Sequence, residues 1–284
     1  MDTSVLKHFS IKKVSAVKKI TLRKSIIEKN QDNSNMNNKD SADQKIEEHL
    51  NKLDWEKIQD KNVKKLLIIG CSDSKNLGGE RSNSKNYFSN NENYNSLIKD
   101  REERVKEYHR LIDVEPNYLF YKDKQKYIKR NKKPIPKDYF KHCLAQGLTM
   151  PAIERYNGRF YSKILRQLYL EKNQNSNLHI LIISGLYGVI EFRDSIIDYH
   201  LEMKKNSFWT KKKNSIVHDA ISKYIKENKI DDEMVFYSLS QSGPYSYVNA
   251  LKPIDTWKSL WITHGRNSSL TYSAEELQVF LNRL

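Results

Sequence analysis

Four short apolar runs recur along the chain, and each is followed by small and polar residues. They occupy residues 64–69, 178–183, 234–237 and 259–263. Unbroken runs rich in β-branched residues are typical of strands that a sheet buries on both faces. The run LHILII at residues 178–183 has the clearest pattern and predicts the central strand.

Segments of helical length separate these runs. The apolar spacing predicts helices over residues 42–59, 96–113, 152–171, 214–228 and 273–284. Strands that alternate with helices indicate crossover connections. The expected fold is therefore α/β and three-layer, with a mainly parallel sheet flanked by helices. The loops that follow its strands converge on one edge, where open α/β sheets bind ligands.

The polar stretches divide the chain into parts. Residues 30–41 are dominated by Asn and Asp and predict a linker, so residues 1–41 form a basic N-terminal extension and linker. Residues 1–29 are either a basic helix that contacts nucleic acid or an acidic surface, or a solvated tail, with an organellar transit peptide as the last alternative. Residues 42–284 form the expected α/β domain. Within it, residues 76–141 are a polar insertion rich in Asn, Ser and Lys.

The charge favours a polyanionic partner. The formal net charge is +15, and lysines alternate with aromatic residues in segments 118–141 and 204–213. Protein surfaces that bind nucleic acid typically combine basic side chains, which contact phosphates, with aromatic rings, which stack on bases. The alternative is that the charge reflects a composition rich in Lys, Asn and Ile. The sequence leaves the oligomeric state open.

Other classes of protein are less compatible with the sequence. The two cysteines, Cys71 and Cys143, lack paired metal-ligand spacing, which predicts a reducing compartment and no metal. No apolar run reaches membrane-spanning length and no secretion signal begins the sequence, so we expect a cytoplasmic protein without a membrane partner. The loop after the first strand lacks the glycine pattern of a P-loop, and we expect no cofactor.

Four motifs occur in a fixed order between residues 66 and 247. They are Cys-Ser-x-Ser-Lys at residues 71–75, Pro-Ala-x-x-Arg-Tyr-x-Gly-x-x-Tyr at 151–161, Ser-Gly-Leu-Tyr-Gly at 184–188, and Asp-x-Ile-x-x-Tyr-x-Leu-x-Met at 194–203. In this order they resemble the YaaA-type (UPF0246-like) peroxide-stress proteins and their shorter relatives. The resemblance implies an α/β body with a basic cleft, DNA binding, and a role in oxidative DNA damage with glycosylase or abasic-site lyase activity.

The first motif contains the strongest candidate nucleophile. A lysine in a partly desolvated site can attack an aldehyde and form the Schiff base that a lyase needs, so Lys75 is the candidate. The alternative is that Lys75 binds a phosphate, together with Ser72 and Ser74. Cys71 is either a redox-sensitive thiol or a small core residue.

The later motifs contribute binding residues and acids. Asp194 and Asp198 are candidates to activate water or to stabilise an oxocarbenium-like sugar, and either could instead cap a helix or pair with Arg193. Arg155 could clamp a phosphate or form a structural ion pair. The remaining binding candidates are small or aromatic residues of the same motifs and of the loop after the third strand, and each tyrosine could equally be a core residue: Tyr156, Gly158, Tyr161, Ser184, Tyr187, Tyr199, Ser240 and Tyr245.

Three functions remain open at this point. The first is a DNA-binding protein that acts on damaged or modified nucleotides with glycosylase or lyase chemistry. The second is a DNA-binding stress protein without catalysis. The third is a glycosidase of free nucleotides or nucleosides, which needs a small pocket but no basic strips.

Overall fold

The structure is a computed structural model that describes about half of the chain. The described residues are 54–72, 75–81, 86–114, 147–158, 161, 177–199, 201, 203, 208–211, 215–239, 251 and 260–261. The predicted extension and linker at residues 1–41 lie outside them, as do the lysine-rich segment 118–141 and the predicted helix 273–284. The predicted domain boundaries therefore stay predictions.

The main sheet has five strands, in the order β5-β4-β1-β7-β8. Its members are β1 (Lys65–Gly70), β4 (Leu178–Ser184), β5 (Gly188–Glu191), β7 (Val235–Ser238) and β8 (Leu260–Trp261). β1 pairs in parallel with β4 and β7, β7 pairs in parallel with β8, and only β5 runs antiparallel, beside β4. All four strands predicted from apolar runs are confirmed, and so is the α/β class.

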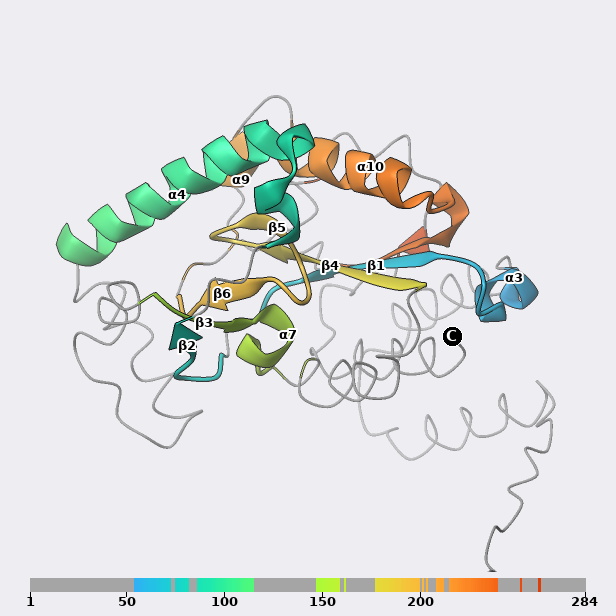
Figure 1. Ribbon diagram of the computed structural model, residues 1–284, viewed down its shortest axis with the longest axis horizontal. Coiled ribbons are helices and arrows are strands. Elements are labelled where there is room, and N and C mark those ends of the chain that lie inside the picture. The colour runs from blue at the N-terminus through green and yellow to red at the C-terminus, as the bar shows by residue number, and fades with distance from the viewer. Residues whose placement is uncertain are drawn as a thin grey trace, which may run out of the picture. The chain divides into compact units, whose positions relative to one another are not determined.

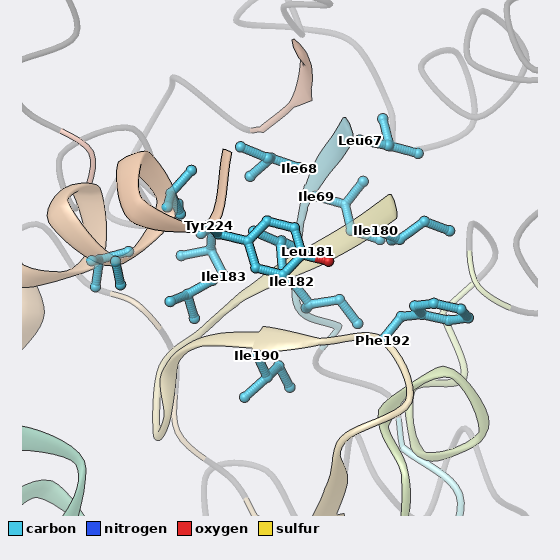
Figure 2. Close-up of a cluster of buried hydrophobic side chains, with 14 of the residues drawn as sticks. Leu67, Ile68, Ile69, Ile180, Leu181, Ile182, Ile183, Ile190, Phe192 and Tyr224 are labelled. Atoms are coloured by element: carbon cyan, nitrogen blue, oxygen red, sulfur yellow. The ribbon is translucent and has the colours of Figure 1, made fainter. Parts of the chain in front are cut away.

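The core lies around β1 and β4, two of the three strands in this sheet that have neighbours on both sides. Their side chains from Leu66 to Ile69 and from Leu181 to Ile183 are at most 1% exposed. Figure 2 shows Leu67 to Ile69 and Leu181 to Ile183 together with Ile190 of β5 and Tyr224, which reaches the cluster from a helix. A strand in a sheet that is covered on both faces has apolar side chains on both of its sides. This explains why apolar and polar residues do not alternate in these runs.

Helices α4 (Asn95–Val114) and α10 (Ile216–Asn228) cover one face of this sheet (Figure 1). α10 begins where the Ser215 hydroxyl accepts a 3.1 Å hydrogen bond from the amide of His218, and it ends at Lys229, which has a left-handed φ of 54°. The segments expected to cover the other face, including residues 162–171, lie outside the described part. The three-layer arrangement therefore stays a prediction.

Part of the predicted insertion packs into the core. The 3₁₀ helices η1 (Tyr87–Asn90) and η2 (Glu92–Tyr94) lead into α4, and Phe88, Tyr94, Leu97 and Tyr108 join the buried cluster. The helix predicted over residues 96–113 is confirmed as α4. The described residues also form the short helices α3 (Trp55–Gln59), α9 (Phe208–Lys211) and η4 (Asp232–Met234).

A second sheet was not predicted. It has three antiparallel strands in the order β2-β3-β6, which are β2 (Glu80–Arg81), β3 (Leu148–Pro151) and β6 (Ser195–Ile197). The loop after β1 runs directly into β2, so this sheet lies near the carboxyl end of β1 (Figure 1).

The helix predicted from residue 152 to residue 171 is wrong at its start. Helix α7 (Ala152–Arg155) has a single turn, because Tyr156 turns to extended backbone (φ −75°, ψ 129°) and forms an isolated antiparallel bridge with Lys75. In this geometry Arg155 donates to the carbonyls of Asn76 and Gly78, whereas the hydroxyl of Tyr156 lies 2.7 Å from that of Tyr199.

Among the described helices, none combines the length and the apolar character needed to cross a membrane.

Candidate functional site

Lys75 lies at the centre of the predicted site. Its backbone bridges Tyr156 and its side chain is buried, with 2% of the residue exposed. The Nζ atom lies 4.4 Å from the centre of the Tyr199 ring and 5.7 Å from the centre of the Tyr156 ring. The amine predicted as a nucleophile is therefore enclosed by aromatic faces just past the carboxyl end of β1.

The hydroxyl groups around Lys75 form one connected chain. The Tyr156 and Tyr199 hydroxyl oxygens are 2.7 Å apart, and the Tyr199 hydroxyl is 2.7 Å from Oγ of Ser184. Ser184 ends β4, and its Oγ accepts the amides of Leu186 at 3.3 Å and Tyr187 at 3.1 Å. The turn Ser-Gly-Leu-Tyr-Gly therefore serves to fix a buried hydroxyl chain.

Two further tyrosines complete what we call the tyrosine cluster: Tyr156, Tyr161, Tyr187 and Tyr199. The ring centres of Tyr156 and Tyr161 are 5.1 Å apart, and those of Tyr187 and Tyr199 are 5.7 Å apart. Burial raises the pKa values of Tyr156, Tyr161 and Tyr199 well above their usual range and the pKa of Tyr187 to about 12. Each phenol is therefore a neutral donor at physiological pH.

Tyr161 and Tyr187 form hydrogen bonds with the backbone of neighbouring strands. Tyr161 donates a 2.6 Å bond to the carbonyl of Gly70, the last residue of β1, and the Tyr187 hydroxyl accepts the amide of Ile197 in β6 at 3.2 Å. The Cys71 thiol follows Gly70 and is half-buried within electrostatic reach of Tyr156, Tyr161 and Tyr199. These two tyrosines thus position the loop after β1 and the second sheet.

Arg155 is directed inward. It is fully buried, and its Nη1 donates to the carbonyl of Asn76 at 2.6 Å while Nη2 donates to the carbonyl of Gly78 at 2.9 Å and to that of Ile196 at 3.5 Å. Its Nη1 is also 3.9 Å from a carboxylate oxygen of the equally buried Asp198. Of the two roles predicted for Arg155, these contacts favour the structural ion pair over the phosphate clamp.

Gly158 packs against the first motif. A Cβ atom at Gly158 would lie 2.5 Å from Oγ of Ser72. A side chain at this position would require the Ser72 side chain or its loop to move, which favours glycine in the second motif. The candidates Ser72 and Gly158 are therefore brought together, although they are far apart in sequence.

The two candidate acids lie in different surroundings. Asp198 is fully buried beside Arg155 and directly precedes Tyr199, which places it next to the tyrosine cluster. Both carboxylate oxygens of Asp194 accept backbone amides, one from Tyr87 at 2.7 Å and one from Glu191 at 3.0 Å. Burial raises the pKa of Asp194, and the amide donors oppose that shift. Asp194 thus organises the turn between β5 and β6, and its catalytic role stays a prediction.

Three candidates lie outside the described residues: Ser74, Ser240 and Tyr245. The loops after β7 and β8, which were expected to complete the site, lie there as well. The parallel pairing of β1, β4 and β7 nevertheless places their carboxyl ends on one edge of the sheet, as predicted.

Sequence reasoning missed two residues that hold the turn after β4. Arg101 of α4 is buried and donates to the carbonyls of Tyr187 at 3.1 Å and Val189 at 2.7 Å. The indole of Trp209 donates to the carbonyl of Gly185 at 3.0 Å. Trp209 had been assigned to a phosphate-contacting strip, but 3% of it is exposed. The sequence around Arg101, in a helix with many charged residues, does not indicate that this one side chain is buried and bound to backbone carbonyls.

Within the described part of the chain, no three His, Cys, Asp or Glu residues are grouped closely enough to hold a metal ion. The chemistry available to the described residues is instead that of an enclosed amine, a buried carboxyl group and a chain of neutral hydroxyl donors. Such a set can form an imine with an aldehyde and can stabilise charge on the reacting oxygen.

Comparison with known proteins places this site within a matched segment. A family model described as "Peroxide stress protein YaaA" matches residues 65–262, which contain every described residue of the site. A UPF0246 protein of Clostridioides difficile (strain 630) is 38% identical over 85 residues, which are 30% of this chain and 34% of that protein. The match therefore spans about a third of the length of that relative.

Proposed function

Because this chain belongs to the family of peroxide stress protein YaaA, we propose that it binds DNA and acts on damaged or modified nucleotides with glycosylase or abasic-site lyase chemistry. The reacting sugar binds past the carboxyl ends of β1 and β4. Lys75 supplies the amine that attacks C1′, and Asp198 stabilises positive charge on the sugar or removes a proton from it.

The position of Lys75 is the observation that carries this proposal. A lysine that forms imines works in a site where water is excluded, because water stabilises the unreactive ammonium form. Lys75 is 2% exposed and its Nζ lies against the Tyr199 ring. The aromatic faces also provide surfaces on which a sugar or an extruded base can stack.

A second buried lysine, Lys65 at the start of β1, has a different role and provides a matched control. Lys65 is 3% exposed, and its Nζ donates to the carbonyls of Asp60 at 2.7 Å and Val63 at 3.0 Å. Burial lowers the pKa of Lys65 from its ordinary value. If burial alone made a lysine reactive, Lys65 and Lys75 would behave alike, whereas the proposal requires only Lys75 to react.

The proposal is tested with DNA that contains a single abasic site. Strand cleavage and binding are measured in the same samples for the parent protein, Lys75→Met and Lys65→Met, over a range of salt concentrations. We expect salt-dependent binding in all three, and cleavage by the parent and by Lys65→Met only. Cleavage by Lys75→Met at the parent rate would remove Lys75 from the mechanism. Binding without cleavage in the parent would support a DNA-binding protein without catalysis.

A second candidate function is the hydrolysis of free nucleosides or nucleotides. The inward direction of the Arg155 guanidinium favours it, because a residue expected to clamp a DNA phosphate instead holds the carbonyls of Asn76 and Gly78. The test is release of free base from nucleosides by the parent protein and by Asp198→Asn. Base release from nucleosides, together with the absence of salt-dependent DNA binding, would place this function first.

A further inference from the structure

The hydroxyl chain beside Lys75 has a fixed direction. An aliphatic hydroxyl has one proton and two lone pairs. Both lone pairs of Ser184 are used by the amides of Leu186 and Tyr187, so its own proton is left to be donated to a neighbouring phenol, and the Tyr199 oxygen is 2.7 Å away. The amides of the turn after β4 therefore begin a series of donors that all point the same way.

The same count of protons and lone pairs applies to Tyr199 and Tyr156, the next two members of the hydroxyl chain. The Tyr199 oxygen accepts the Ser184 proton, so the single proton of Tyr199 is donated to the Tyr156 oxygen at 2.7 Å. Tyr156 then accepts through its oxygen and has its own proton left to donate. Within the described residues, the hydroxyl contacts of Tyr156 run to Tyr199 and Ser184. Neither can accept its proton, because both lone pairs of Ser184 are used and the Tyr199 proton lies between the two phenol oxygens.

The direction of this chain has an electrostatic consequence. Successive hydrogen bonds polarise one another, so a hydroxyl that accepts a strong bond becomes a better donor. The chain is fully buried, and a donor aimed at developing negative charge is most effective where water is excluded. Because burial keeps the phenols neutral, the donor is present throughout the physiological pH range.

We propose that Tyr156 donates a hydrogen bond to the aldehyde oxygen of an abasic site while Lys75 attacks the carbon, and that Tyr199 and Ser184 are positioning residues that polarise this donor. This inference rests on the proposed function. Lys75 and Tyr156 are bridge partners in the backbone, so an amine and a hydroxyl donor come from adjacent points of one site. One side chain attacks a carbonyl carbon while the other binds its oxygen.

The step balances without a further reactant. The Nζ lone pair forms the bond to C1′, and the π electrons of the carbonyl move onto its oxygen, where the Tyr156 hydroxyl stabilises the charge. A proton then passes from the nitrogen to this oxygen, and loss of water gives the imine. Tyr156 keeps its own proton through the addition, so the chain need not transfer a proton to Ser184.

The test measures the rate of imine formation under single-turnover conditions, with borohydride added at successive times to trap the imine. Tyr156→Phe removes the donor, and we expect its maximal rate to fall about 100-fold while the half-saturating protein concentration stays the same. Tyr199→Phe removes only the polarising bond, and we expect a fall of about 10-fold. Tyr94→Phe is the matched control, because Tyr94 is also buried and donates a 2.6 Å bond, to Glu227.

The double variant Tyr156→Phe/Tyr199→Phe separates this role from a structural one. If Tyr199 acts through Tyr156, the double variant reacts at the rate of Tyr156→Phe alone. Rates that fall in proportion to the product of the two single effects would overturn the proposal, as would a parent rate in Tyr156→Phe. If Tyr156→Phe does not fold, as thermal unfolding would show, Ser184→Ala and Tyr199→Phe must still slow the reaction without weakening DNA binding.

The outcomes also distinguish the two proposals. A parent protein that forms no adduct would end both the proposed lyase function and this inference. A parent protein that forms the adduct, with Tyr156→Phe forming it equally fast, would end this inference and leave the lyase function standing.

Discussion

Arg155 donates a 2.6 Å hydrogen bond from Nη1 to the carbonyl of Asn76, the residue that follows Lys75 in the chain. The amide of Asn76 donates back to the carbonyl of Arg155 at 2.7 Å, and its side chain donates to the carbonyl of Glu154 at 2.6 Å. Helix α7 and the end of the loop after β1 are thus joined in both directions, which fixes the backbone from which the Lys75 side chain extends.

Replacing Arg155 should therefore destabilise the fold. In Arg155→Met, the carbonyls of Asn76 and Gly78 lose a donor and the buried carboxyl of Asp198 loses a cation 3.9 Å away. We expect the free energy of unfolding to fall by about 3–5 kcal/mol, measured by urea denaturation. Arg193→Met, at an exposed position, should change it by less than about 0.5 kcal/mol. An Arg155 variant with parent stability but a weaker salt dependence of DNA binding would indicate a phosphate clamp instead.

Gly158→Ala should displace the loop after β1. The added methyl carbon would lie 2.5 Å from Oγ of Ser72, so one of the two segments must move. We expect the variant to lose stability and the lyase activity that we propose. Removing the obstructing side chain in the double variant Gly158→Ala/Ser72→Gly should restore most of the stability, as measured by thermal unfolding. A double variant no more stable than Gly158→Ala would show that the contact with Ser72 is not the cause.

Glu191 should make stability depend on pH. Burial raises its pKa from 4.5 to about 7, so the folded state holds a proton that the unfolded state releases at lower pH. Glu191 therefore destabilises the folded state increasingly as the pH rises from about 4.5 to about 7. Glu191→Gln removes this effect and should gain stability relative to the parent between pH 5 and pH 8, measured as the difference in unfolding free energy. A difference that is the same at both pH values would contradict the prediction.

The sequence predicts the main sheet because burial on both faces leaves a direct signal. An unbroken apolar run such as residues 178–183 is compatible with little other than a strand or a buried helix, and flanking glycines and polar residues limit its length. The second sheet has no such signal. Its strands are two to four residues long, and β2 consists of two exposed residues that pair with β3, nearly seventy positions away.

The candidate site was predictable as a set of residue types but not in its connections. The motifs correctly brought Lys75, Ser72, Tyr156 and Ser184 to one place, because the carboxyl ends of parallel strands meet. The role of each side chain depends on the direction in which it points. The spacing of residues in the sequence predicts that direction only within a continuous helix or strand. The Asn157-Gly158 pair after Tyr156 is a turn signal, and it would have indicated that no continuous helix runs through this position.

The central claim is that Lys75 is the amine that forms an imine with DNA. The most direct measurement incubates the parent protein with end-labelled DNA containing one abasic site, reduces the mixture with borohydride, and maps the attached residue by mass spectrometry. The account predicts a covalent adduct on Lys75 in the parent protein and in Lys65→Met, and none in Lys75→Met. An adduct on any other lysine, or no adduct while the same samples bind DNA, would contradict it.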